Sequence, residues 1–290
     1  MKSVKRTFIL VFVVALILLG VVVGATMFWV NQQHDSEVYV GAYDRYMNSL
    51  SSSYKMHSVM DADIVLKVKA DEESEEVVQI PMDVVMLYDA DIYEENEHGI
   101  MDMSMKFLTQ DTSYKSEMYI VPDKDDKRLT YVSVISSDSE DREWSKTNDD
   151  ISVVPHQNLV QKSLFERGVA QDKDGYHYII GDSSYVLDIL RGKSTFVTLL
   201  GDFMSDTSLV DEAFDTAAAS AKAVYQFDDD YRLVSVVIED FSYWTEEVSV
   251  SMTWTLNFDD FGSFTLDDVA VPSDVSGSAS DMTDVNLFAK

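Results

Sequence analysis

Methionine recurs at every second position of residues 98–110, HGIMDMSMKFLTQ, where Met101, Met103 and Met105 share one register with Phe107. Thioether side chains are flexible and polarisable, so such a row can fill an irregular core or line a space for acyl chains of varied shape. Thioethers also bind Cu(I). Copper sites commonly gather several methionines on one loop, whereas these alternate along the chain. The pattern therefore favours the two apolar interpretations over a copper site.

Cysteine is absent from the 290-residue chain. This excludes disulfides, thiolate metal sites, a cysteine nucleophile and a cysteine that carries a lipid. No HExxH, GxSxG, P-loop or GxGxxG motif occurs, and nothing in the sequence pairs two carboxylates in an apolar pocket. We expect no enzyme activity, catalytic residue, cofactor or metal site. The five histidines lie far apart, and we expect surface or structural roles for them: His34, His57, His98, His156 and His177.

Two short acidic stretches resemble calcium loops, DKDD at residues 123–126 and DKDG at residues 172–175. Neither has the ligand spacing of an EF-hand or its glutamate at the twelfth position. We interpret both as turns.

A period of two extends well beyond the methionine stretch and predicts β-strands with one apolar face. It recurs in residues 57–70, 77–88, 114–121 and 128–135, joined by charged turns, and again in residues 221–258. Such segments predict one antiparallel sheet of seven or more strands. Its apolar face is the candidate ligand-binding surface, with these residues: Met60, Ile64, Leu66, Ile80, Met82, Val84, Met86, Met101, Met103, Met105, Phe107, Met118 and Trp254.

Two segments have helical spacing instead. Residues 37–56 place Val38, Tyr43, Tyr46, Met47 and Leu50 on one face. A second helix is predicted to begin near Pro155, with four apolar residues on one side and Gly168 near its end: Leu159, Val160, Leu164 and Phe165. Residues 183–217 are predicted to be helix or loop, and residues 259–272 a turn and an edge segment.

The N-terminus predicts a membrane anchor. Residues 8–30 are uncharged and apolar, and as a helix they span about 34 Å, enough to cross a bilayer. Lys2, Lys5 and Arg6 precede them, so the positive-inside rule places the rest of the chain outside the cytoplasm. The alternative is a signal peptide cleaved after Ala25. We divide the chain into a basic flank (1–7), an anchor or signal segment (8–30), a linker (31–35), a folded domain (36–275) and a flexible tail (276–290).

The chain is strongly acidic, with 52 acidic and 22 basic residues and a net charge of −30. This charge repels nucleic acid, because nucleic-acid binding depends on basic side chains that neutralise phosphate. A solvated surface that aids solubility explains the acidity, and a saline habitat or cation binding are the alternatives.

Several stretches together resemble the LolA/LppX-like half-barrels, especially the secreted lipoproteins of Gram-positive bacteria built on that fold. They are a helix ending in SSSYKM, the alternation in IPMDVVM and IMDMSM, EWSK ahead of a helix, and the closing FDDFGSF and VAVPSDV. The resemblance covers about residues 36–276. It implies an α+β fold, with a strongly curved antiparallel sheet wrapped over helices and an apolar cavity that in some members carries lipids or lipoproteins. Those proteins are usually tethered by a lipid on cysteine, which this chain lacks.

Two functions remain open. One is a membrane-tethered, extracytoplasmic carrier of a hydrophobic, lipid-like ligand at the cell envelope. The other is a structural or protein-interaction domain whose core is filled by its own side chains and whose protein partner the sequence does not identify.

Overall fold

The computed structural model describes residues 41–69, 77–108, 110–123, 128–135, 142–149, 159–182, 221–244 and 248–281. Within these ranges no helix is long and apolar enough to cross a membrane. The predicted anchor at residues 8–30 and the linker at residues 31–35 lie outside the described residues, as do residues 183–217.

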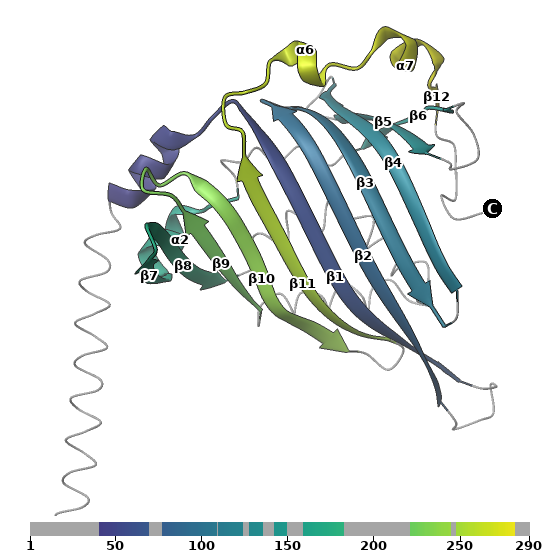
Figure 1. Ribbon diagram of the computed structural model, residues 1–290, viewed down its shortest axis with the longest axis horizontal. Helices are drawn as coiled ribbons and strands as arrows, with labels where there is room; N and C mark the ends of the chain where they lie inside the picture. The colour runs from purple at the N-terminus through teal and green to yellow at the C-terminus, as the bar shows by residue number, and fades with distance from the viewer. Residues whose placement is uncertain are drawn as a thin grey trace, which may run out of the picture.

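Twelve described strands form a single open sheet (Figure 1), in the order β12-β6-β5-β4-β3-β2-β1-β11-β10-β9-β8-β7. The first six are β1 (Ser53–Lys69), β2 (Val77–Tyr93), β3 (Asn96–Phe107), β4 (Gln110–Pro122), β5 (Arg128–Ile135) and β6 (Ser145–Asp149). The others are β7 (Val169–Lys173), β8 (Tyr176–Asp182), β9 (Lys222–Phe227), β10 (Leu233–Trp244), β11 (Val248–Asp259) and β12 (Ser280–Asp281). Every pair is antiparallel except β12 with β6. The predicted α+β class and the single antiparallel sheet are confirmed.

The pairing of β1 with β11 joins the N-terminal and C-terminal strands into one sheet. Its register runs from Lys55 opposite Asp259 to Leu66 opposite Val248. On its other edge β1 pairs with β2 along their whole length. Because side chains alternate between the two faces of a strand, this register brings the apolar positions of all three strands to one face. We call it the inner face, and the opposite one the outer face.

One row of side chains crosses the inner face from strand to strand. Trp254 lies opposite Met60, Met60 opposite Met86, Met86 opposite Met103, and Met103 opposite Tyr114. The first four of these residues are buried in the main hydrophobic core. Met60, Met86 and Met103 are therefore packed within this core.

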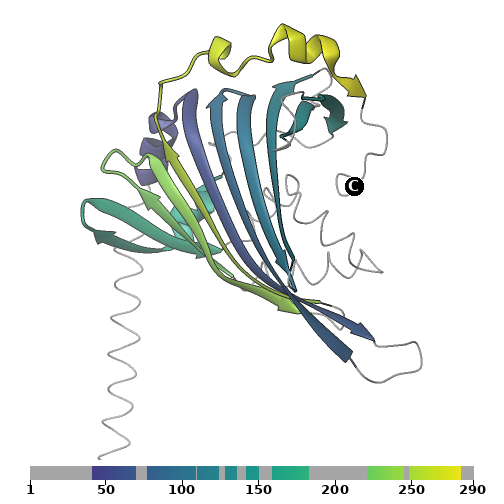
Figure 2. The same cartoon turned by 45° about the vertical axis from the view of Figure 1, so that its right-hand side comes forward.

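Short helices flank the sheet. Residues 41–49 are helical, and Tyr46 is fully buried with its ring 5.9 Å from that of Phe227 and 6.1 Å from that of Phe165. The other helices with described bounds are α2 (Lys162–Arg167), α6 (Leu266–Val269) and α7 (Ser273–Ser278). Figure 2 shows α6 and α7 lying across one end of the strands, next to β2–β5.

Two helix predictions need correction. The first helix, predicted over residues 37–56, ends at residue 49, and residues 53–56 belong to β1 because the alternation of that strand begins before residue 57. Met47, predicted on the apolar face of this helix, is 40% exposed. The second helix begins at Lys162 and not near Pro155, because Gln161 has extended dihedral angles (φ −89°, ψ 151°) and caps it. Leu159 and Val160 are buried as predicted, although they lie outside the helix. Residues 151–158 are outside the described residues.

The prediction of a turn at DKDG is confirmed. Asp174 and Gly175 both have positive φ, 54° and 80°, and connect β7 to β8. This is the two-residue hairpin connection in which glycine avoids the strain of a side chain. Most of DKDD lies outside the described residues.

The C-terminal predictions are wrong for residues 266–281. A capping box between Thr265 and Asp268 starts α6 where an edge segment was expected. The predicted flexible tail from residue 276 is wrong as far as Asp281, since α7 continues to Ser278 and β12 pairs with β6. Val275 is the reason: it is buried against aromatic residues of the outer face, which keeps this segment on the sheet. Residues 282–290 are outside the described residues.

The two neighbouring methionines Met103 and Met105 should differ in what they contribute to stability. Met103 is 2% exposed, whereas Met105 on the same face is half-buried. Met103→Ala should lower the free energy of unfolding by about 2–5 kcal/mol, and Met105→Ala by less than about 2 kcal/mol. Met103→Phe should be destabilising by roughly 1–3 kcal/mol, because the site is already filled. Denaturant unfolding of the three variants measures these values; equal losses at the two methionines would contradict the assignment of Met103 to the packed core.

Candidate functional site

The predicted ligand-binding residues all lie on the inner face. The register of β1, β2, β3 and β11 aligns them, and β4 adds Met118 opposite Gly99. The structure therefore brings together every residue of the predicted apolar surface, although they come from five strands.

Burial divides these residues into two groups. The residues of β1 and β11, most of those of β2, and Met103 are buried: Met60, Ile64, Leu66, Met82, Val84, Met86, Met103 and Trp254. The remaining ones are half-buried: Ile80, Met101, Met105, Phe107 and Met118. Met101, Met105, Phe107 and Met118, on β3 and β4, form what we call the methionine margin. The inner face is thus closely packed at its centre and less covered along the margin.

Trp254 has its polar atom satisfied within this apolar surface. Its indole Nε1 donates a hydrogen bond to Ser58 Oγ at 2.8 Å, and both side chains are buried. A buried indole N–H needs such an acceptor. Ser58 occupies an apolar register position on β1 for this reason.

A polar group that the sequence interpretation missed lies at one end of the inner face. Tyr88 donates a hydrogen bond through its hydroxyl to Glu97 Oε1, and Glu97 is only 3% exposed. Burial, then the charge of Glu97 and the hydrogen bond to it, raise the pKa of Tyr88 well above its usual 10.0, although the charge of Arg128 opposes this. A Cβ on Gly99 would lie closer than 3.0 Å to the Tyr88 ring, so glycine is what lets the ring reach Glu97.

The sequence did hold a signal for this group. Glu97 and Gly99 continue the register of Met101, Met103 and Met105, so a charged residue and a glycine stand in an otherwise apolar row. Ser116 on β4 is a similar exception. It lies opposite Met101, is 5% exposed, and its Oγ has no hydrogen-bond partner.

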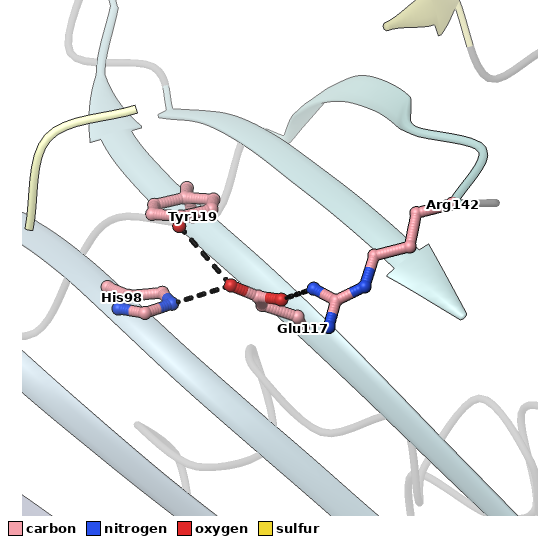
Figure 3. A network of polar contacts seen from close by, with 4 residues as sticks. All are labelled: His98, Glu117, Tyr119 and Arg142. Atoms are coloured by element: carbon pink, nitrogen blue, oxygen red, sulfur yellow. Dashed lines mark hydrogen bonds and ion pairs between the residues drawn. The ribbon is translucent and has the colours of Figure 1, made fainter. Parts of the chain in front are cut away.

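A second polar network lies on the outer face, at the same end of the sheet (Figure 3). Glu117 Oε1 lies 3.0 Å from His98 Nε2 and accepts a hydrogen bond from the Tyr119 hydroxyl at 3.2 Å. Glu117 Oε2 forms an ion pair with Arg142. The His98 and Tyr119 rings stack in parallel, with centroids 4.3 Å apart. The network ties β3 and β4 to the segment that leads into β6.

The network sets the protonation of its own members. Burial tends to raise the pKa of Glu117, but the hydrogen bond with His98 and the charge of Arg142 outweigh it, and the pKa falls below its usual 4.5. Burial, followed by the charge of Glu117 and the hydrogen bond to it, raises the pKa of Tyr119 to about 12. Glu117 is therefore held as an anion and Tyr119 as a neutral donor, which is the arrangement of a stable clamp.

A small second core surrounds this clamp. Tyr119, Tyr131 and Val275 are buried together, and the Trp144 ring lies 5.7 Å from that of Tyr119. Burial of Tyr119 on the outer face was not predicted, because the period of two assigns only one apolar face to each strand. The clamp and this core together hold the C-terminal segment against β4–β6.

The three histidines in the described ranges all pair with carboxylates. His98 contacts Glu117 and His177 Nδ1 lies 2.7 Å from Asp172 Oδ1. His57 lies between Asp89 and Asp259 on the outer face, with Nε2 3.5 Å from Asp259 Oδ2. Within the part of the chain that the structure describes, no group of three or more His, Cys, Asp or Glu side chains is arranged so that it could hold a metal ion. His34 and His156 are outside the described residues.

No family model and no curated protein matches this chain. The function is therefore argued from the two faces of the sheet.

The outer-face clamp predicts acid-dependent stability. Because the pKa of Glu117 is lowered in the folded protein, its stabilisation is complete above about pH 4.5 and is lost as the pH falls through the lowered value. Glu117→Gln should cost roughly 1–3 kcal/mol at neutral pH, since it removes the negative charge and replaces one of the two accepting oxygens with a donor group. The difference from the parent should shrink below pH 4.5 in urea unfolding.

Asp61→Asn is the matched control, because Asp61 is an exposed carboxylate of the same face. It should change stability by less than about 0.5 kcal/mol. A Glu117→Gln difference that stays constant down to low pH would contradict the role of the clamp.

Proposed function

We propose that this protein is a membrane-tethered, extracytoplasmic carrier that holds a hydrophobic, lipid-like ligand on the inner face of its sheet. The observation that carries the proposal is the methionine margin, a half-buried apolar strip beside a packed apolar centre. A strip of this kind offers contact area to an apolar ligand without first opening the core.

Methionine suits this role better than the β-branched residues that strands usually prefer. Its unbranched, flexible side chain adapts to ligands of different shape, whereas valine and isoleucine are stiff at χ1. The resemblance to the LolA/LppX-like half-barrels supports the same conclusion, because an open antiparallel sheet with an apolar face is the arrangement that this fold uses. The proposal also includes the strong sheet curvature that the resemblance implies. It includes the membrane anchor that we predict at residues 8–30 of this chain.

The alternative function, a structural or protein-interaction domain, is favoured by one observation. Met60, Met86 and Met103 are buried in the core formed by the protein itself. We therefore assign ligand contact to the methionine margin and a supporting role to this central row.

Ligand binding can be tested with two substitutions on β3. The full chain is expressed in bacteria fed a photoreactive fatty acid, and after irradiation the adducts are located by mass spectrometry. Met105→Glu should reduce adducts on β3 and β4 about tenfold or more, because an unpaired carboxylate against an acyl chain costs more than the ~1.4 kcal/mol that corresponds to a tenfold change.

Ser104→Glu is the matched control. It places the same charge one residue away, on the exposed outer face, and should leave the adducts unchanged. If the parent gave no adducts on β3 and β4, or if both variants lost them equally, the carrier proposal would be contradicted. The structural or protein-interaction function would then remain.

The location can be tested on intact cells. Protease added outside should degrade residues 31–290, because the basic flank retains the N-terminus in the cytoplasm. N-terminal sequencing of the untreated protein should find Met1 or Lys2, and a cytoplasmic marker should stay intact. A mature chain that begins at Thr26 would show that the apolar segment is a cleaved signal and not an anchor.

A further inference from the structure

Glu97 is a buried carboxylate with few partners. It lies on the inner face of β3, and the Tyr88 hydroxyl donates its hydrogen bond. Among the described residues no other group donates to this carboxylate or forms an ion pair with it. An ionised carboxylate can accept about four hydrogen bonds. The described residues therefore use only a small part of the accepting capacity of Glu97.

This arrangement is costly for a protein that binds nothing there. Moving a carboxylate out of water is unfavourable unless the charge is paired and hydrogen-bonded, and a single neutral phenol compensates it only in part. Arg128 is a buried cation on the same face, and its charge acts on the neighbouring Tyr88. Glu117, the corresponding carboxylate of the outer face, has three side-chain partners.

The position of Glu97 relates it to the proposed ligand. Glu97, Gly99 and the methionines of β3 share one face, so the carboxylate stands at the end of the apolar row that finishes at Phe107. At about 3.3 Å per residue, Glu97 and Phe107 are roughly 33 Å apart, so an amphiphile with its head at Glu97 would have room to lie along this row.

Ser116 is an independent sign of a ligand at this end. Its Oγ is buried and has no hydrogen-bond partner among the described residues. Ser116 lies opposite Met101, between Glu97 and the Phe107 end of the methionine margin. A buried hydroxyl without a partner is unfavourable by itself. A polar group near the head of an amphiphile would satisfy it.

We propose that Glu97 binds the protonated amine of a cationic amphiphile, whose apolar chain lies along the methionine margin. This inference rests on the proposed carrier function and names the chemical class of its ligand. The ammonium group supplies the positive charge and the donors that the Glu97 carboxylate lacks. The Tyr88 hydroxyl holds the carboxylate in place, and Ser116 donates to a polar group of the ligand near its head. The net charge of −30 attracts such a cation to the protein.

Three photoreactive probes of equal chain length test the proposal: an alkylamine, an alkyl alcohol and an alkyl carboxylate. Each is added to membranes that contain the full chain, and adducts on β3 and β4 are quantified after irradiation. The parent protein should give about tenfold more adduct with the amine than with the alcohol, and least with the carboxylate, because only the amine adds a positive charge to its hydrogen bond with the Glu97 carboxylate.

Glu97→Gln should abolish the preference for the amine while retaining adducts with the alcohol, which also reports that the variant is folded. Glu117→Gln is the matched control, since it removes a carboxylate from the outer face of the same sheet, and it should keep the preference. If Glu97→Gln fails to fold, the ratio of amine to alcohol in the parent decides the question.

The outcomes separate the two proposals. Equal adducts with all three probes in the parent would overturn the assignment of an amine and leave the carrier function standing. A preference for the amine that survives Glu97→Gln would also overturn it. An absence of inner-face adducts with every probe would overturn the carrier function itself.

Discussion

The pairing of β1 with β11 is the constraint on which the whole sheet depends. It joins strands almost 200 residues apart in sequence, and its register, together with that of β1 with β2, places the apolar positions of all three strands on the inner face. A shift by one residue would send every side chain of β1 to the opposite face. Trp254 fixes this register chemically, because its hydrogen bond to Ser58 crosses between the two strands. The methionine row is a consequence of this alignment.

The two faces of the sheet each contain a carboxylate, Glu117 outside and Glu97 inside, and the two differ in their side-chain partners. On the outer face Glu117 is held by His98, Tyr119 and Arg142, and its pKa is lowered accordingly. This clamp contributes to stability and holds the C-terminal segment in place. On the inner face Glu97 has the Tyr88 hydroxyl alone among the described residues. The difference in partners separates a group used for folding from one that we assign to ligand recognition.

Much of this architecture was predictable from the sequence, because the period of two is long and regular. This period predicts that Met60, Met82 and Trp254 share one face, and the observed strand register confirms it. Two kinds of feature were not predicted. The period of β3 assigns Glu97 and Gly99 to the face of the methionines, but it does not reveal that Glu97 is buried beside Tyr88. The helix α7 was missed because SDVSGS is small and polar, and only Val275 within it is buried.

The sequence by itself determined the alternation of each strand, and therefore the chemical character of its two faces, because successive side chains must point in opposite directions. It also determined the absence of cysteine chemistry. The tertiary structure alone decided which strands are neighbours, which end of each apolar row is covered, and which carboxylates acquire partners. Those properties depend on contacts between residues far apart in the chain, such as Arg142 with Glu117 or Tyr119 with Val275. A local pattern contains no information about such contacts.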